Sequence, residues 1–297
     1  MAESRPWSPA QWWSTWPTAN ALAKVMSIMM ALGGLAPMVA PVVGGAVLTL
    51  GGSWRAVFWV LVALGVAMLA TAYVFVPESL PPENRRGGEL RELSAGLLKV
   101  VRLPVFVGYT LTAALSGFTM MAYIANSSYV LQQQKGMAPM PFALFFAATA
   151  GTQVLLSLVN ARLVGRFRPR TLVGFGLAGS AAAVAILAIA VFALDTPLLL
   201  TCAGFMILMA MQAFIFGNAS ALAVAQAPEV AGAASGVLGV VQAIAMAVSA
   251  PLASLGGATT ATPMIWVMLA GVAAAITAYL IVSRSPGYPR RSSLGTP

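Results

Sequence analysis

The chain has 297 residues, of which 60% are hydrophobic and only 8% are charged, and its mean hydropathy is +0.88. So few polar residues cannot cover a water-soluble fold of this length, and repeated apolar runs of about 20 residues are typical of a polytopic helical membrane protein. The net charge of +9 does not indicate nucleic-acid binding, because the basic residues lie in short gaps between apolar runs and not along one face.

Residues 1–20 form a leader that differs from the rest of the chain, because it is rich in tryptophan and proline and contains no apolar run. A signal peptide is excluded, since the leader has neither a hydrophobic core segment nor a small-residue cleavage site. The leader is either a tryptophan-anchored interfacial segment or unstructured sequence without a role, and we favour the second interpretation.

Beyond the leader, the apolar runs predict an all-α polytopic membrane bundle of about eight transmembrane helices, each able to cross about 30 Å of hydrocarbon. The expected spans are 25–50, 56–76, 104–127, 141–163, 171–193, 198–224, 231–256 and 263–283. They divide the chain into 21–76 with two spans, a central loop at 77–103, and 104–297 with six spans and a tail.

The first span contains two prolines one turn apart. A proline inside a helix removes a backbone hydrogen bond and kinks the helix, but a membrane bundle tolerates the break where its neighbours satisfy the freed groups. Small residues around the prolines would let another helix approach closely. The motif residues are Gly34, Pro37, Ala40, Pro41, Gly44 and Gly45. They predict a kinked helix in a tight interhelical contact, or a kink that merely fits the bundle.

Trp54 and Arg55, at the start of the second span, are interpreted as anchors at the membrane interface. The central loop that follows has leucines at helical spacing. Leu90, Leu93, Leu97 and Val101 would share one side of a helix, with charged residues around the rest. This pattern predicts an amphipathic helix on the membrane surface. An ordinary solvated linker helix is the alternative.

The last six spans carry polar, aromatic and methionine side chains that predict a substrate cavity. A lone amide in hydrocarbon needs a partner, so it should face the bundle interior or a watered cavity. Aromatic and methionine side chains beside it make a pliable surface for varied apolar compounds. The candidates are Tyr109, Phe118, Met120, Tyr123, Asn126, Gln153, Gln212, Asn218 and Gln242. The alternative is that each amide only bridges two helices.

Three glycines at small-residue spacing, Gly232, Gly236 and Gly239, are expected to let the span 231–256 pack closely.

The basic residues predict the orientation of the bundle. All of the 16 lysines and arginines except Arg55 and Lys135 fall in the N-terminal segment, the 77–103 loop, the 162–170 turn or the C-terminal tail. Since cytoplasmic loops are enriched in Lys and Arg, we expect these segments and both termini to be cytoplasmic. The protein would then be a multi-pass protein of the cell (inner or plasma) membrane, with the lipid bilayer as a partner.

The titratable residues argue against an enzyme. The chain has no histidine, its single cysteine, Cys202, lies in an apolar run, and every acid lies in a loop or at a span end: Glu3, Glu78, Glu83, Glu89, Glu92, Asp195 and Glu229. No nucleophile–base pair or metal-ligand set can be assembled from these residues, so we expect no catalytic residue, metal site or cofactor. No span holds a proton carrier either, although proton-coupled transport needs an ionisable group inside the membrane.

Five stretches in order resemble the major facilitator superfamily, and within it the Bcr/CflA branch of bicyclomycin and chloramphenicol exporters. "APVVGG" resembles the proline-glycine antiporter signature of the fifth helix, with alanine before the proline in place of glycine. The other stretches are "WRAVFWV", "PESLPPENRR", "YIANSSYVLQQQKGMAPMPFALFFAATA" and "GNASALAVAQAPEVAGAASGVLGVVQ". The resemblance covers about residue 21 to the end.

The resemblance implies a function and a missing part. A major facilitator has twelve spans in two halves, so the eight spans correspond to helices five to twelve, and 21–76 would hold the last two helices of the N-terminal bundle. The family implies export of small molecules or drugs by proton antiport. The family's proton-binding acid and basic loop fall in the absent helices. We therefore keep two alternatives: a fragment that is inactive or needs a partner chain supplying those helices, and an exporter of sugar or amino-acid derivatives.

Overall fold

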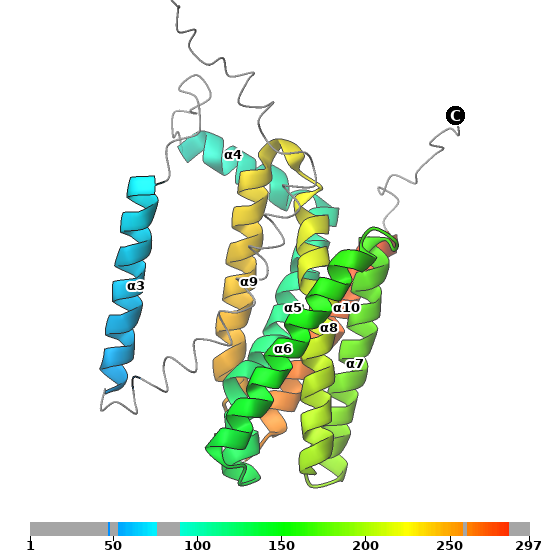
Figure 1. Cartoon of the computed structure of the whole chain (residues 1–297). Coiled ribbons are helices and arrows are strands. Elements are labelled where there is room, and N and C mark those ends of the chain that lie inside the picture. Colours follow the sequence, from blue (N-terminus) through cyan, green and yellow to red (C-terminus); the bar gives the residue numbers. More distant parts are fainter. Residues whose placement is uncertain (1–46, 48–52, 76–89, 258–259, 285–297) are drawn as a thin grey trace, which may run out of the picture. The chain divides into compact units, whose positions relative to one another are not determined.

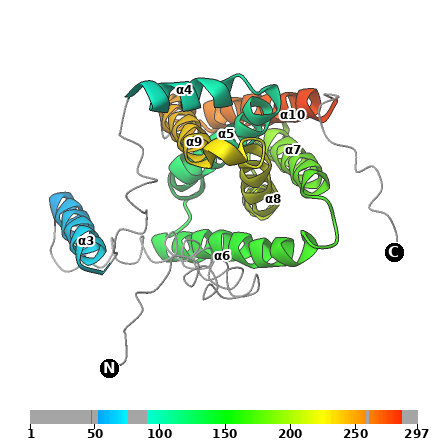
Figure 2. The ribbon, with the colours of Figure 1, turned by 90° about the horizontal axis from the view of Figure 1, so that it is seen from above.

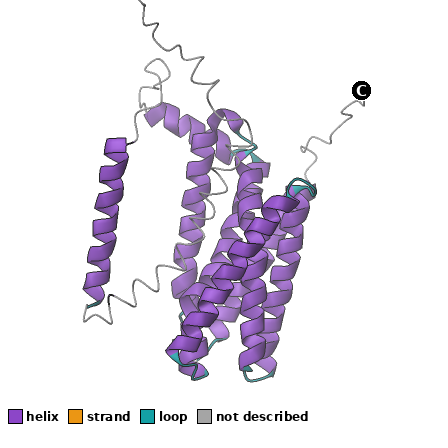
Figure 3. Ribbon diagram, in the orientation of Figure 1, coloured by secondary structure: helices purple, strands orange, loops and turns teal. Residues whose placement is uncertain are grey.

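The computed structural model describes residues 47, 53–75, 90–257 and 260–284. Every regular element in this part of the chain is a helix (Figure 3). Seven of the described helices are long and apolar enough to cross a membrane. The predicted fold class, an all-α polytopic membrane bundle, is confirmed.

The chain divides into two compact units, Met1–Ser79 and Leu80–Pro297. The first unit is described by one long helix, α3 (Trp54–Phe75), which matches the second predicted span and begins at the predicted anchors. The leader and, apart from Val47, the first predicted span lie outside the described residues. So do the motif residues Gly34, Pro37, Ala40, Pro41, Gly44 and Gly45.

The second unit consists of a surface helix and six long helices. In chain order they are α4 (Leu90–Val101), α5 (Pro104–Ser128) with a π-helical continuation η2 (Tyr129–Gln134), α6 (Pro139–Leu163), α7 (Pro169–Ala193), α8 (Leu198–Val224), the short 3-10 helix η3 (Pro228–Val230), α9 (Ala231–Ala253) and α10 (Thr262–Arg284). The six predicted spans coincide with α5–α10 to within a few residues.

Prolines set where three of these helices begin. Pro104, Pro139 and Pro169 each lie in the first turn, where the missing backbone N–H is not needed. The residue before each proline is extended, because the proline ring disfavours helical backbone there. Gly136, whose φ of 67° is left-handed, follows the end of η2 and turns the chain toward α6.

The six long helices run alternately up and down, and α4 lies across one end of them (Figures 1 and 2). We call this the α4 end and the opposite one the η2 end. The closest packing joins α7 to α8, and α5 to α8, α9 and α10. In Figure 2, α6 lies along one side of the unit, and it packs chiefly against α8. α5 is therefore the central helix of this unit.

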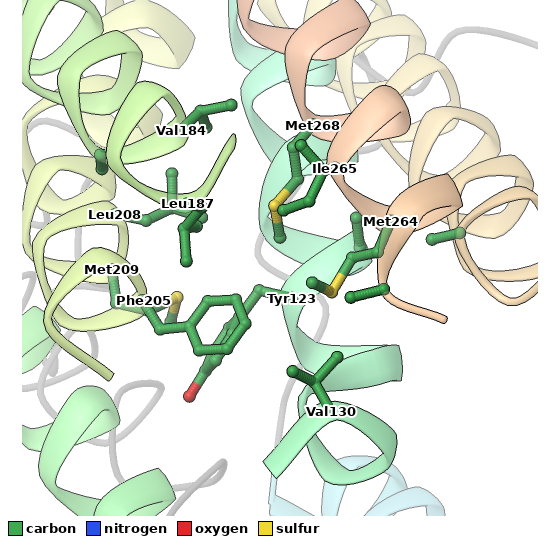
Figure 4. Close-up of a cluster of buried hydrophobic side chains, with 14 of the residues drawn as sticks. Tyr123, Val130, Val184, Leu187, Phe205, Leu208, Met209, Met264, Ile265 and Met268 are labelled. Atoms are coloured by element: carbon green, nitrogen blue, oxygen red, sulfur yellow. The ribbon is translucent and has the colours of Figure 1, made fainter. Parts of the chain in front are cut away.

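Two apolar clusters fill the interior of the unit. The cluster toward the η2 end joins α5, α7, α8 and α10 through Tyr123, Leu187, Phe205 and Met268 (Figure 4). The cluster toward the α4 end includes Val100, Phe106, Tyr109, Ile215 and Ala219. Several polar side chains near these clusters pair across helix boundaries.

The glycines that allow the closest approach are not the predicted ones. Gly232, Gly236 and Gly239 on α9 have no described neighbour within 4 Å of a Cβ added to them. On α10, a Cβ at Gly271 would lie 2.4 Å from Thr119 Oγ1 of α5. The prediction for the α9 glycines is therefore wrong within the described helices, because α9 presents that side to no described helix.

The helix predicted in the central loop is present as α4, but Val101 of the predicted apolar face is not the residue that packs inward. Val100 is fully buried against the bundle, whereas Val101, placed on the apolar face, is 52% exposed. The cause is the contact with α9, where a Cβ at Gly96 would lie 3.6 Å from Ala233 Cβ. Gly96 and Val100 are one turn apart, so that contact turns Val100 inward.

Candidate substrate site

The predicted site residues lie on four helices of the second unit. α5 carries Tyr109, Phe118, Met120, Tyr123 and Asn126, α6 carries Gln153, α8 carries Gln212 and Asn218, and α9 carries Gln242. The structure joins most of them into two seams of polar and sulfur-containing side chains, one on each side of the α5–α8 contact.

The first seam, between α5, α6 and α8, consists of Met120, Tyr123, Thr149, Thr152, Gln153 and Met206. The hydroxyls of Tyr123 and Thr149 lie 2.8 Å apart and share a hydrogen bond. The Tyr123 ring is fully buried, with its centroid 4.8 Å from that of Phe205 and 5.9 Å from that of Phe146. Figure 4 shows the Tyr123 ring beside that of Phe205. Tyr123 is thus held between aromatic rings and a hydroxyl of α6.

The strip continues along α6 and meets two sulfur atoms. Gln153 Nε2 donates to Met120 Sδ at 3.8 Å. Thr152 Oγ1 donates to the carbonyl of Ala148 at 2.8 Å and lies 3.3 Å from Met206 Sδ. All four side chains are half-buried. A thioether is a weak acceptor, so a better acceptor on a ligand can replace it at small cost.

The second seam, between α5, α8 and α9, consists of Gly117, Phe216, Ser220, Gln242 and Met246. Gln242 Nε2 donates to Ser220 Oγ at 3.2 Å. Beside this pair, a Cβ at Gly117 would lie 3.2 Å from Met246 Cε and 3.7 Å from Phe216. The seam therefore combines one weakly held amide with a soft apolar wall.

Between the seams, α5 and α8 are joined by Gln212. Its Nε2 donates to the carbonyl oxygen of Ser116 at 3.1 Å, and its side chain is almost fully buried. Gln212 Oε1 and Ser116 Oγ have no hydrogen-bond partner among the described residues. One acceptor and one hydroxyl thus stay unsatisfied in the middle of the unit.

The remaining amides tie the helices together nearer the two ends. Asn218 Nδ2 donates to Asn160 Oδ1 at 2.8 Å, which joins α8 to α6. Ser254 Oγ donates to Asn126 Oδ1 at 3.0 Å, which joins the end of α9 to α5. Both asparagines from the predicted set are buried. These bonds match the alternative in which an amide bridges two helices.

Two predicted residues lie apart from both seams. Tyr109 is buried in the apolar cluster at the α4 end. Phe118 is half-buried, and its backbone carbonyl accepts a hydrogen bond of 2.6 Å from Ser249 Oγ of α9. Trp54 and Arg55 lie on α3, in the other unit.

Sequence reasoning missed the hydroxyl partners of the amides and of Tyr123. Thr149, Thr152, Ser220 and Ser254 are short side chains that are common in membrane helices, and their spacing gave no signal of its own. Pairing them with an amide requires knowledge of which helices are neighbours, so the partners became visible only in the fold.

The charged groups lie outside the seams. Among the described residues of this unit, the carboxyl groups belong to Glu92 in α4, Asp195 in the α7–α8 turn and Glu229 in η3. Lys99 Nζ donates to Glu229 Oε2 at 2.6 Å, and this hydrogen bond and its charge attraction lower the pKa of Glu229 below the ordinary value. At the η2 end, Lys135 Nζ donates to the backbone carbonyl of Asp195 at 2.6 Å.

A bundle of long apolar helices with polar seams between them is the architecture of a polytopic membrane protein. A profile of the Major Facilitator Superfamily matches residues 10–250, and the chain belongs to this superfamily. Its members are transporters and not enzymes. The match includes the second half of the segment that we treat as a leader.

Two of the relatives carry names that refer to drug resistance. The chain is 27% identical to a bicyclomycin resistance protein homolog of Haemophilus influenzae over 262 residues, which are 88% of this chain and 65% of the relative. It is 29% identical to multidrug resistance protein MdtL of Escherichia coli O6:H1 over 276 residues, 90% of this chain and 65% of that protein. An uncharacterised transporter of this superfamily, YdgK of Bacillus subtilis, is 26% identical over 248 residues, which are 83% of this chain and 61% of that protein. The chain thus spans less than two thirds of the length of these relatives.

Proposed function

We propose that this chain forms part of an exporter that moves small, neutral or weakly polar drugs, such as bicyclomycin- or chloramphenicol-like compounds, across the cell membrane. The observation that carries the proposal is the pair of seams. Half-buried methionine, threonine and glutamine side chains flank the α5–α8 contact on both sides. The amide of Gln153 donates to a thioether at 3.8 Å and that of Gln242 to a hydroxyl at 3.2 Å. The names of two relatives support the same class of cargo.

The chemistry of the seams suits compounds of varied shape. Methionine side chains are flexible and polarisable, so they adapt to different apolar surfaces. An amide can exchange a sulfur or hydroxyl partner for a carbonyl or hydroxyl of the ligand at little net cost. Of the predicted site residues, we propose that Met120, Gln153 and Gln242 contact the substrate directly. Tyr123, Asn126, Gln212 and Asn218 would hold the helices in place.

The proposed orientation places the α4 end in the cytoplasm, with both chain termini on that side of an inner or plasma membrane. Helix bounds put α4, the α6–α7 turn and the end of α10 at this end, and they carry Arg91, Lys99, Arg102, Arg162, Arg166, Arg168, Arg170 and Arg284. The α7–α8 and η2–α6 turns of the other end contribute Lys135. This asymmetry is the one that governs membrane insertion. In the same scheme, residues 21–76 are the last two helices of an N-terminal bundle and 104–297 are the C-terminal bundle.

Proton antiport is proposed from the family resemblance and not from the seams. A coupled proton needs an ionisable group within the membrane, and in this scheme the group belongs to helices that precede α3 in the twelve-helix fold. Proton coupling would therefore depend on sequence beyond the described bundle.

A second candidate is favoured by the lengths of the relatives, of which this chain covers about 65%. In this alternative, the chain is inactive alone and works only with a segment or a partner chain that supplies the remaining helices. In both candidate functions the cargo can extend to sugar or amino-acid derivatives, since the amides and hydroxyls of the seams offer hydrogen-bond donors and acceptors.

The test is drug resistance in cells that lack their own exporters. One strain expresses the chain alone, and a second expresses it joined to the first four helices of the Haemophilus influenzae relative. We expect resistance to bicyclomycin or chloramphenicol in the second strain, abolished by a protonophore. Resistance in the strain that expresses only this chain would refute the partner-dependent alternative. Resistance in neither strain would refute drug export.

The seam residues are tested in the active strain. Gln153→Ala and Gln242→Ala should each lower the resistance about five-fold, the effect of one net hydrogen bond. Gln226→Ala is the matched control, because this half-buried glutamine lies outside both seams and its side chain bonds, among the described residues, to the carbonyl of Leu222. An equal loss in all three variants would show that the seams do not contact the substrate.

A further inference from the structure

The turn between α6 and α7 concentrates exposed positive charge at the α4 end. Arg162, Arg166 and Arg168 are exposed, and none of them has a hydrogen bond or ion pair with another described side chain. Within this turn and the adjoining helix ends, no described acid neutralises them. Guanidinium groups bind phosphate oxygens through paired N–H donors.

The neighbouring end of α10 extends the basic surface. Arg170 Nη2 donates to the carbonyl of Ser283, and Tyr279 Oη donates to the carbonyl of Arg170 at 3.0 Å. These two bonds fix the start of α7 beside the end of α10. Arg284, the last residue of α10, is exposed next to Ser283. The fourth exposed guanidinium is thus brought to the same region by bonds that belong to the fold.

Apolar side chains lie directly beside these arginines. Phe167, between Arg166 and Arg168 in sequence, is 52% exposed, and Val164 is also exposed. One turn earlier on α6, Leu158 and Val159 are exposed as well. This surface has guanidinium groups at the end of α6 and exposed apolar side chains in the turn and along α6. It therefore matches a molecule with an anionic head and acyl chains.

We propose that the α6–α7 turn, with the end of α10, is a binding site for one anionic phospholipid. The phosphate group lies against Arg166, Arg168 and Arg284, and the acyl chains lie along Phe167 and the exposed strip of α6. The site is separate from both seams, so it goes beyond the transport function proposed above. Because Arg170 is engaged with Ser283, it supports the turn and does not hold the lipid.

The test uses native mass spectrometry of the full chain in detergent with phosphatidylglycerol and, separately, phosphatidylcholine. We expect one tightly bound phosphatidylglycerol and no comparable phosphatidylcholine. Replacing both Arg166 and Arg168 with glutamine should weaken phosphatidylglycerol binding about 30-fold, as two arginines near a membrane surface each contribute about 1 kcal/mol. Arg102→Gln is the matched control, since it removes an exposed charge at the same end but on the α4–α5 junction.

A second arm separates the lipid from its headgroup. Glycerol phosphate should bind far more weakly than phosphatidylglycerol, and Phe167→Ser should weaken only the lipid. Equal binding of glycerol phosphate, or an equal loss in Arg102→Gln, would overturn the proposal. A lower melting temperature of the Arg166/Arg168 double variant than of the wild type, both measured without lipid, would also overturn the proposal. The two arginines would then pair with protein groups and not with lipid.

Discussion

Asn218 and Asn160 illustrate how single amides hold this bundle together. Their side chains meet at 2.8 Å between α8 and α6, and Asn218 Nδ2 also donates to the carbonyl of Phe214. Interhelical hydrogen bonds inside membranes contribute modestly, about 0.6 kcal/mol on average and up to about 1.7. Because Asn160 Oδ1 accepts from Asn218, removing either amide leaves the other without this partner.

The strength of this pair can be measured with a double-mutant cycle. Asn160→Leu and Asn218→Leu should each lower the free energy of unfolding in detergent, and the double variant should lose less than the sum of the two. We expect a coupling energy of about 0.6–1.7 kcal/mol. Additive losses would show that the two side chains do not interact.

Gly271 provides a test of close packing at a single residue. A Cβ at this position would lie 2.4 Å from Thr119 Oγ1 and 3.0 Å from Phe118 Cδ1. Gly271→Ala should therefore destabilise the unit by about 1–3 kcal/mol, the usual cost of overpacking. Thr119→Ala in the same chain should recover part of that loss. Gly232→Ala on α9, which has no described neighbour within 4 Å, is the control and should be nearly neutral in the same thermal unfolding assay.

At the scale of single residues, the sequence predicts which side chains need partners but not which partners they find. Gln212 is an example, because an amide in an apolar span must be buried or watered, and it is buried. Its partner is the backbone carbonyl of Ser116, which no residue pattern encodes. Gly271 was missed for the same reason, since close approach depends on the facing helix.

At the scale of elements, α4 is fastened over the turn between α8 and α9. Lys99 of α4 bonds Glu229 of η3, and Gly96 packs on Ala233 at the start of α9. The ion pair is exposed on both sides, so it orients α4 and contributes little to the overall stability. Loss of the ion pair should therefore loosen α4 and leave the rest of the unit unchanged.

The attachment of α4 should depend on pH in one direction. The pKa of Glu229 is lowered by Lys99, so its stabilising effect is present above the ordinary glutamate pKa of about 4.3 and is lost as the pH falls through the lowered value. Hydrogen exchange at neutral pH should be faster in α4 of Glu229→Gln than in the wild type. The difference in α4 exchange between the two proteins should disappear as the pH falls through the lowered pKa of Glu229.

The natural comparison for this effect is Gln226→Ala, in the same turn but away from Lys99. Faster exchange of α4 in that variant as well, or a difference between Glu229→Gln and wild type that persists at low pH, would contradict a role for the ion pair.

The elements themselves were largely predictable from hydrophobic runs. The spans 104–127 and 198–224 correspond closely to α5 and α8 because long apolar runs bounded by proline or polar turns have few alternatives in a membrane. The π-helix η2 was not predicted, since its sequence "YVLQQQ" has no feature that separates it from an ordinary helix end. The burial of Val100 in place of Val101 reflects the contact of α4 with α9, which the sequence of α4 does not encode.

At the scale of the whole molecule, the alternation of α5–α10 makes a topological prediction. In a Cys202→Ser background, a cysteine at position 165 lies in the α6–α7 turn and one at position 194 lies in the α7–α8 turn; both sites are exposed. A membrane-impermeant thiol reagent added to intact cells should label position 194 and not position 165. Labelling of both positions from outside would refute the proposed orientation.

The order and class of the helices followed from the sequence because hydropathy and charge act along the chain. Which helices are neighbours did not follow from the sequence, because α5 packs against helices that are far from it along the chain, including α8, α9 and α10. The two seams arise from those distant contacts. For this reason, the sequence indicated that α5, α6, α8 and α9 carry polar groups but not that Gln153 and Gln242 lie on opposite sides of the α5–α8 contact.

The limited packing of α6 has a consequence for the evolution of this protein. α6 packs chiefly against α8 and supplies Thr149, Thr152 and Gln153 to one seam. Where a helix has few neighbours among the described ones, substitutions on it cost the folding of this unit little, so drug selection can alter its side chains before the rest of the unit is destabilised. In a population challenged with successive antibiotics, the first adaptive changes in this unit should accumulate on α6.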